Sequence, residues 1–392
     1  MTQRLYYTDS YLDTFRARVE ELSADGVRVY LDRTAFYPTS GGQPFDTGTL
    51  GGAAVVAVVD EGERVAHVLA EPAAALAPGA EVEGRIDRGR RFDHMQQHTG
   101  QHLLSALLQE RWGWATTSVH FGPETNTLDL AVESISPEQV AEVERQANEV
   151  VYENRPLAVT FEDAAEADGL RKASERTGTL RIVTIEGVDR SACGGTHVRA
   201  TGEIGVILLR RTERVRKTVR LEFVCGGRAV RRARADFEAL SRIAGPLSTS
   251  LDDAPAVVAA QTEQLREAAS IRKRMREELA GAQARALADA AAPDGAGVRW
   301  IVERRPAWDA DELRALAHAV STLPKAVLVA AVEAPPTVML AASADSGVDA
   351  GVALKPALVA AGGRGGGSPR VAQGSVPVAA ALDAVLAALL PR

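Results

Sequence analysis

The sequence predicts an α+β fold with four parts: a small N-terminal β-barrel, an α+β domain, a helical spacer and a small C-terminal α/β domain. Four observations lead to this prediction, one for each part. Residues 1–90 contain short alternating or apolar runs, residues 91–225 mix such runs with helical periodicity, and residues 226–290 have a heptad-like spacing. An alternation of strands and helices then fills residues 291–392.

The first part is expected to contain strands at 27–32, 54–59 and 64–69. They predict a small barrel or a curled sheet. Between them, residues 36–48 (FYPTSGGQPFDTG) form a loop that such a barrel does not require. Gly41 and Gly42 allow φ > 0 and close approach to a ligand, which Gln43 could hydrogen-bond; a simple glycine turn is the alternative.

The second part opens with a helix predicted over 93–110, where leucines form an apolar stripe. His94, His98 and His102 are spaced by four residues and fall on nearly one line of this helix. Two of them could therefore reach a single ion. A histidine pair on a helix can also be solvent-facing or hydrogen-bonded, so the helix alone leaves both interpretations open.

Further elements of this part follow from pattern and capping. Ser136 can cap a helix over 137–154, with Pro137 at its first position and Gln139 completing a capping box. A second helix is expected near 163–171. Strands are expected at 118–122, 127–132, 157–161, 180–185, 205–210 and 219–224.

The loop 191–198 (SACGGTHV) supplies Cys193 and His197, four residues apart. With His98 and His102 they give three nitrogens and one sulfur, a set that Zn²⁺ prefers over hard cations. About ninety residues separate the two halves, so the ion would join a helix to a sheet loop, unlike a zinc finger. Such an ion could be structural, or it could polarise water or a carbonyl.

Residues 226–290 read as a helical hairpin or a coiled-coil spacer, whose imperfect seam includes Gln261 and Arg272 and allows a homodimer. Beyond a linker at 291–297, strands are expected at 298–303, 326–332 and 338–342 and helices at 309–323 and 377–390. The segment 361–374 (AGGRGGGSPRVAQG) carries Arg364 and Arg370. It suits a phosphate, or it is a disordered surface linker.

Composition restricts the function classes. No run of 18 apolar residues occurs and the first ten residues do not resemble a signal peptide, so we expect a cytoplasmic protein with no membrane partner. Two cysteines exclude a disulfide framework. The net charge of -7 argues against indiscriminate nucleic-acid binding, but residues 199–234 hold eleven Arg or Lys against three Glu. That stretch is either a surface for a polyanion or a solvated face.

The motifs HTGQHLL and CGGTHV, preceded by FYPTSGGQPFDTG, resemble the editing domain of alanyl-tRNA synthetases and the freestanding AlaX alanyl-tRNA editing proteins. Residues 226–392 are similar to the C-terminal tRNA-binding module of the same synthetases. Together the match covers nearly the whole chain and resembles the long form of AlaX. The class II aminoacylation core has no counterpart, so we expect no activation of alanine.

The resemblance implies a trans-editing hydrolase, independent of ATP, that removes serine and also glycine wrongly esterified to alanine tRNA. It implies zinc held by His98, His102, Cys193 and His197. It implies that Gly41, Gly42 and Gln43 line the pocket near the terminal adenosine. It also implies that backbone donors of Gly194 and Gly195 stabilise the oxyanion at the reacting ester. For the serine hydroxyl we expect Thr117 or its neighbours Thr116 and Ser118. For tRNA we expect Arg210, Arg211, Arg214, Arg364 and Arg370.

Two other functions remain open at this stage: a tRNA-binding or regulatory protein with a purely structural zinc, and a zinc hydrolase of another ester. Three further residues lie outside the ligand set that the resemblance implies, and the flanking role of His94 follows from the family motif HTGQH. His94 is expected to flank the ligands, His120 either orients a ligand or substrate or is a satisfied core histidine, and Cys225 is expected to be a buried small residue.

Overall fold

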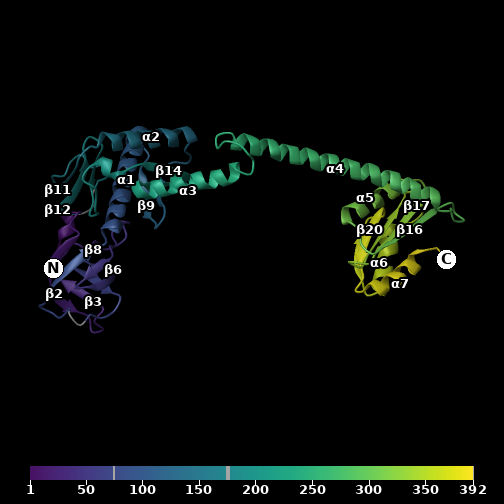
Figure 1. Cartoon of the computed structure of the whole chain (residues 1–392), viewed down its shortest axis with the longest axis horizontal. Coiled ribbons are helices and arrows are strands. Elements are labelled where there is room, and N and C mark those ends of the chain that lie inside the picture. The colour runs from purple at the N-terminus through teal and green to yellow at the C-terminus, as the bar shows by residue number, and fades with distance from the viewer. Residues whose placement is uncertain (74–75, 174–176, 392) are drawn as a thin grey trace. The chain divides into compact units, whose positions relative to one another are not determined.

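The computed structural model describes residues 1–73, 76–173 and 177–391. They divide into two compact units, Met1–Arg242 and Ile243–Arg392, and Figure 1 shows the elements of each. No helix among these residues is long and apolar enough to cross a membrane. Sheets and helices occur in both units, in agreement with the predicted α+β class.

The first unit begins with a closed barrel in which the first strand, β2 (Thr14–Leu22), pairs with the last, β8 (Glu81–Ile86). Inward side chains such as Phe15, Leu31 and Val65 form its core. A two-residue strand, β1 (Gln3–Arg4), pairs with β4 (Arg33–Thr34) beside it. Around the barrel the order is β2 (Thr14–Leu22), β3 (Arg28–Leu31), β7 (Arg64–Leu69), β6 (Ala53–Glu61), β5 (Gly48–Leu50) and β8 (Glu81–Ile86).

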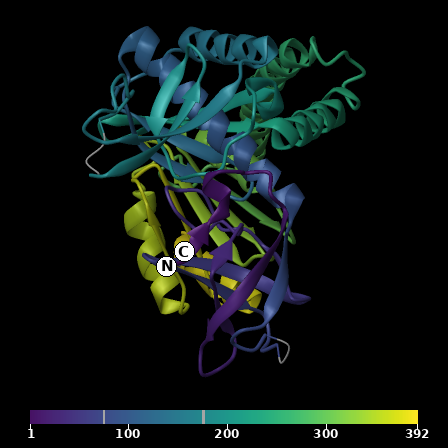
Figure 2. The same ribbon diagram turned by 90° about the vertical axis from the view of Figure 1, so that its left-hand side faces the viewer.

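Helix α1 (Arg88–Trp112) leads from the barrel into an α+β lobe, as Figure 2 shows. Asp87 caps its first turn by accepting from the Arg90 amide, and Gly113 ends it in the left-handed conformation. The buried face of α1, including Leu103 and Leu104, packs into one core with the lobe sheet. The helix thus carries the histidines from the barrel into the lobe.

The lobe contains a four-stranded and a three-stranded antiparallel sheet. The larger has the order β14 (Ile207–Val215), β15 (Thr218–Cys225), β10 (Asn126–Leu130), β9 (Thr116–Phe121). The smaller has the order β11 (Leu157–Asp163), β12 (Thr179–Ile185), β13 (Asp189–Ala192). Helix α2 (Pro137–Glu153) has the predicted capping box of Ser136 and Gln139.

The helix predicted near 163–171 is wrong. Strand β11 continues to Asp163, whose carboxylate then accepts from the Ala165 amide in a turn. Gly169 has φ +69°, a conformation that does not continue a right-handed helix.

The predicted spacer consists of two helices, α3 (Gly226–Ala244) and α4 (Ala254–Ala290). The heptad-like seam is not buried along α4, because Val258, Leu265, Met275 and Leu279 are 42 to 73% exposed. Within the second unit α4 instead packs through the small residues Ala284 and Ala288.

The second unit is built on a sheet with the order β16 (Arg299–Arg305), β17 (Ala326–Val332), β18 (Thr337–Ala342), β20 (Val371–Ser375), β19 (Arg364–Gly367). Alternate residues of β17 enter two cores. Leu328 packs with α5 (Ala310–Ser321), and Val327 packs with α6 (Ala350–Ala360) and α7 (Leu382–Leu389). Helices therefore cover both faces of this sheet.

The glycine-rich segment 361–374 contains an ordered hairpin of β19 and β20, so its interpretation as a flexible loop or a disordered linker is wrong. A side chain on Gly374 would meet Leu358 of α6 at 2.1 Å. A side chain on Gly365 would meet the backbone of Gly374 at 2.4 Å. The glycines at these two positions allow close packing of strand on strand and helix.

Candidate metal centre

The four predicted ligands lie together in the first unit. One donor atom from each of His98, His102, Cys193 and His197 lies within 4.8 Å of the others. The histidines come from one face of α1 and from the loop that follows β13, and that loop also supplies the cysteine. The three imidazoles are buried and Cys193 is partly exposed.

Each imidazole is oriented by a partner at Nδ1. His98 Nδ1 lies 2.8 Å from Gln43 Oε1, and His102 Nδ1 lies 2.8 Å from Asp189 Oδ2. His197 Nδ1 lies 3.1 Å from the Thr99 hydroxyl. These contacts leave the Nε2 atoms for an ion, which is the usual arrangement around a metal-binding histidine.

The spacing of the donors fits a tetrahedral ion. In a tetrahedral zinc site, bonds of about 2.1 Å to nitrogen and about 2.3 Å to sulfur place those atoms about 3.5 Å apart. Cys193 Sγ lies 3.3 Å from His197 Nε2 and 3.5 Å from His98 Nε2. The chain could therefore hold a metal ion at this place, and the mixed donor set favours a borderline-soft cation.

The electrostatics of the cluster also suit a cation. Burial disfavours a thiolate at Cys193, but the charges of His98, His197 and His102 together lower its pKa well below the ordinary value. Burial opposes a charge on His102 too, yet Cys193 and Asp189 raise its pKa to about 9. Burial, followed by the charge of His98, lowers the pKa of His197 to about 3. The lowered pKa of Cys193 favours the thiolate, which is the form of cysteine that binds a metal ion.

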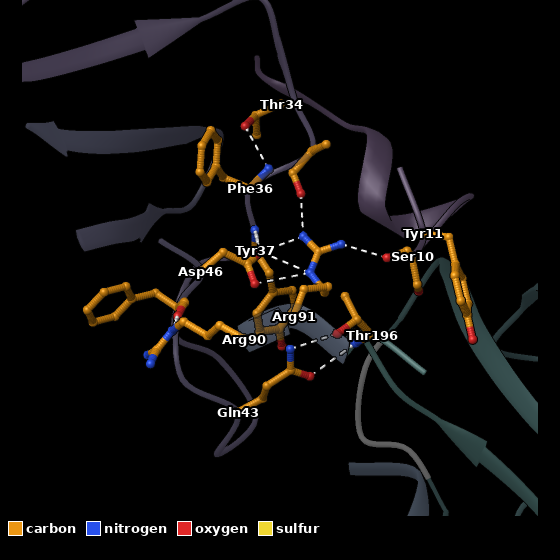
Figure 3. A network of polar contacts seen from close by, with 12 residues as sticks. Ser10, Tyr11, Thr34, Phe36, Tyr37, Gln43, Asp46, Arg90, Arg91 and Thr196 are labelled. Atoms are coloured by element: carbon orange, nitrogen blue, oxygen red, sulfur yellow. Dashed lines mark hydrogen bonds and ion pairs between the residues drawn. The ribbon is translucent and has the colours of Figure 1, made fainter. Parts of the chain in front are cut away.

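The glycine loop of residues 36–48 contacts the cluster through Gln43. Gly41 and Gly42 have φ +57° and +85°, as predicted, in a tight turn closed by backbone bonds between Ser40 and Gln43. Gln43 is only 1% exposed, and its amide also bonds Thr196 at 2.8 Å. Figure 3 shows this contact. Both polar ends of Gln43 are therefore occupied by the protein, which makes it a support for His98.

A cleft of about 980 Å³ opens beside the four ligands. His98, His102 and Cys193 line it together with the predicted Gly41, Gly194 and Gly195. Tyr7, Phe161, Arg171, Lys172 and Arg181 also line it. A cleft with aromatic and basic walls around a metal site suits an anionic ligand that carries rings.

The hydroxyl candidates for serine lie at a smaller hollow of about 290 Å³ that shares Gly41, Gln101, Arg171 and Lys172 with the cleft. The Thr117 hydroxyl donates to the Asp129 carbonyl at 3.0 Å. The Thr116 hydroxyl donates to Ser105. Gln101 was not among the predicted site residues. It donates to the same Ser105 oxygen and lines both the cleft and the smaller hollow.

The predicted tRNA contacts lie outside the cleft. Arg210, Arg211 and Arg214 are exposed on β14, but Arg210 pairs with Asp236. Several other basic side chains of 199–234 are paired with carboxylates, including the buried Arg228 with Asp93. Arg364 and Arg370 are exposed on the hairpin of the second unit.

The remaining histidines and the second cysteine are not among the four ligands. His94 is buried with an unpartnered Nδ1, and burial lowers its pKa to about 4. His120 is exposed on β9, so it is not a core histidine. Cys225 is fully buried at the end of β15, as predicted.

Sequence and structure comparisons relate these features to known proteins. Family models match residues 9–90 (tRNA synthetases class II (A)), 180–221 (Threonyl and Alanyl tRNA synthetase second additional domain) and 297–390 (DHHA1 domain). The alanine-tRNA ligase of Methanoregula boonei is 32% identical over 402 residues, 98% of this chain and 43% of the ligase. The alanyl-tRNA editing protein Aarsd1 of Bos taurus is 36% identical over 212 residues, 53% of this chain and 47% of that protein. The chain is an AlaX-like protein.

This AlaX-like chain spans about half the length of these relatives. The class II match falls on the barrel, and the second-domain match includes β12, β13 and the Cys193 loop. A solved C-Ala domain of Aquifex aeolicus alanyl-tRNA synthetase covers 24% of the chain at 22% identity, and its TM-score of 0.19 is too low to support a conclusion.

Proposed function

We propose that this AlaX-like protein hydrolyses the ester of serine, and also of glycine, wrongly attached to alanine tRNA. The observation that supports this most strongly is the cluster of His98, His102, Cys193 and His197 at the wall of the cleft. Relatives named alanyl-tRNA editing proteins match 53% of this chain at 36% identity.

The proposed reaction would correct the limited amino-acid specificity of a synthetase. A synthetase pocket shaped for alanine admits the smaller glycine and rejects serine only in part, so a second site must remove the errors. That second site must spare alanine, which it can do by hydrogen-bonding the serine hydroxyl. Gln101 and the hydroxyls of Thr116, Thr117 and Ser118 are the polar groups from which we expect this contact.

We propose Zn²⁺ as the ion at this site, because the three imidazoles and one thiolate match its preferred donors. When bound, it would polarise water or the ester carbonyl. Gln43 and Asp189 hold the imidazoles of His98 and His102 in place, so the chain itself fixes the geometry of the site. Gly41 and Gly194 give the terminal nucleotide room to approach.

The nucleic acid would enter over basic residues. Arg171 and the exposed Lys172 line both the cleft and the smaller hollow, where they could meet the phosphates next to the terminal adenosine. We propose that exposed arginines of β14 and of the β19–β20 hairpin contact the rest of the tRNA. These arginines are Arg210, Arg211, Arg214, Arg364 and Arg370.

The test is release of labelled serine from serine-charged alanine tRNA, compared with release of alanine from correctly charged tRNA, in parallel with metal analysis. We expect fast release of serine and slow release of alanine. A metal-loaded protein that spares both would refute the proposal. It would then favour a tRNA-binding protein with a structural ion, whereas hydrolysis of unrelated small esters alone would favour a different esterase.

The ion has its own test. Cys193→Ala should lose both bound metal and serine release, since it removes the thiolate of the cluster. Cys225→Ala is the matched control, because that cysteine is buried and is not one of the four ligands. Retained activity of Cys193→Ala without metal would refute the role of the ion.

A further inference from the structure

Arg181 on β12 is a buried cation at the edge of the metal centre. Its exposure is 8%, and it lines the cleft with His98 and Cys193. Among the described residues no carboxylate lies within ion-pair distance of Arg181, whereas the buried Arg91 and Arg228 are each paired with one. Burial lowers the pKa of Arg181, as expected for a cation removed from water.

The contacts of Arg181 leave part of its guanidinium unused. Its Nε donates to the Tyr7 carbonyl at 2.9 Å, and its Nη1 donates to the Cys193 carbonyl at 2.7 Å. A guanidinium has five N–H donors, so these two bonds leave about three. The backbone of a metal ligand thus fixes the position of a cation whose remaining donors have no partner among the described residues.

Of the two backbone donors expected to stabilise an oxyanion, those of Gly194 and Gly195, the second is occupied. The Gly195 amide donates to Cys193 Sγ at 3.3 Å. The Thr196 amide donates to Gln43 Oε1 at 3.1 Å. In this turn only the Gly194 amide has no acceptor among the described residues. Charge that develops on a substrate oxygen in the cleft therefore has one free backbone donor in the described part of this turn, and a further donor would add to its stabilisation.

We propose that Arg181 is a catalytic residue that donates hydrogen bonds to the oxyanion formed during ester hydrolysis; this inference rests on the proposed function. Water attacks the ester carbonyl carbon, a carbon–oxygen bond forms, and the carbonyl π electrons move onto the oxygen. When this intermediate collapses, the bond to the ribose oxygen breaks, and that oxygen takes up the proton lost by the water. Arg181 keeps its own protons throughout.

The charge balance favours an oxyanion over a phosphate as the partner of Arg181. A neutral ester brings no negative charge to the buried guanidinium in the ground state, whereas the intermediate brings one. The interaction is therefore stronger in the transition state, which is the condition for catalysis. A phosphate is charged from the start and has Lys172, which is exposed, at the same cleft.

The first test compares Arg181→Gln with Arg190→Gln, the same change on the neighbouring strand β13, where the side chain pairs with Glu162 and does not line the cleft. With metal content and melting temperature measured for both, Arg181→Gln should lower kcat for serine release by about 10² to 10³ with little change in KM. Arg190→Gln should keep wild-type kcat. A metal-loaded Arg181→Gln with wild-type kcat would overturn the proposal. A wild-type protein without any serine release would instead refute the proposed function.

The second test measures binding and does not need turnover. A seryl-adenosine phosphonate mimics the anionic intermediate, and the corresponding amide mimics the neutral ester. Arg181→Gln should weaken phosphonate binding by about the same 10² to 10³ while leaving amide binding unchanged. Equal weakening of both would assign Arg181 to general positioning or phosphate binding and overturn the proposal.

If Arg181→Gln loses its metal, Arg181→Ala in the presence of added metal and guanidinium ion decides the matter. The free cation should restore part of the lost kcat, and urea of similar shape without charge should not. Absence of rescue in metal-loaded protein would overturn the proposal.

Discussion

Arg91 of α1 and Asp46 of the glycine loop form an ion pair that is almost completely buried (Figure 3). Arg91 also donates to the Ala35 carbonyl at 2.6 Å, and Asp46 accepts from the Tyr37 amide at 2.6 Å. Both ends of the loop are thus fastened to the helix that carries His98 and His102. Gln43 projects from this loop onto His98. The pair therefore connects the barrel to the orientation of a ligand.

Asp46→Ala should destabilise the protein by about 3 to 5 kcal/mol, because it leaves Arg91 buried without a counterion. The measurement is chemical denaturation of the full chain. Glu21→Ala is the control on the same barrel, since the pair of Glu21 with Arg64 is exposed and should contribute less than about 1 kcal/mol. Equal small losses for both variants would contradict the importance of the buried pair.

The two glycines of the CGGTH turn should respond differently to alanine. A side chain on Gly195 would meet the His98 ring at 2.1 Å, whereas one on Gly194 would meet Tyr7 only at an ordinary 3.7 Å. Gly195→Ala should therefore displace His98 and reduce bound metal, and Gly194→Ala should bind metal as the wild type does. Metal titration of the two purified variants checks this, and equal affinities would show that the ring can shift at no cost.

Asp189→Asn should weaken metal binding by about 10 to 100 fold, the usual effect of losing a charged partner of a ligand histidine. Asp189 is buried and accepts from both His102 Nδ1 and Arg171 Nε. Competition with a chromogenic chelator measures the affinity. Glu162→Gln changes a carboxylate of β11, in the same sheet, that pairs with Arg190, and it should leave the affinity unchanged. Unchanged affinity in Asp189→Asn would mean that His102 needs no charged partner.

Local signals in the sequence predicted which four side chains lie together, because four-residue spacing has a direct meaning on a helix and in a tight turn. His98 and His102 follow one face of α1, and Cys193 and His197 span a turn whose second glycine is required by close packing. The capping box at Ser136 was equally local and is confirmed.

The supporting residues could not be predicted in the same way, because their partners are distant in sequence. Asp189 acts on a histidine 87 positions earlier, and Arg91 meets a carboxylate 45 positions earlier. The predicted helix near 163–171 failed because a side-chain turn at Asp163 and the conformation of Gly169 outweighed a weak pattern. In α4 the apolar side chains that follow a regular spacing are exposed, and Ala284 and Ala288 make the contacts.

The barrel should lose stability in mild acid because of His67. This side chain is fully buried, with Nδ1 3.0 Å from the Val29 carbonyl and Nε2 2.7 Å from the Thr34 hydroxyl. Because the carbonyl can only accept, Nδ1 carries the proton of a neutral ring and Nε2 accepts from the hydroxyl. Burial lowers the pKa of His67 to about 4 from the ordinary 6.5.

The direction of this pH dependence follows from whether the folded or the unfolded chain binds the proton. Between pH 6.5 and about 4 the unfolded chain binds a proton at His67 that the folded chain does not, so the free energy of unfolding falls as the pH falls through this window. The full effect is about 3 kcal/mol, and this group adds nothing further below pH 4. We expect His67→Gln to be less stable at pH 7.5 but to show a flatter curve between pH 6.5 and 4. His120→Gln, on the exposed face of β9, should follow the wild type. Since all other titrating groups are common to the proteins, the difference between their denaturation curves isolates His67, and parallel curves for His67→Gln and wild type would show that its ring does not resist protonation.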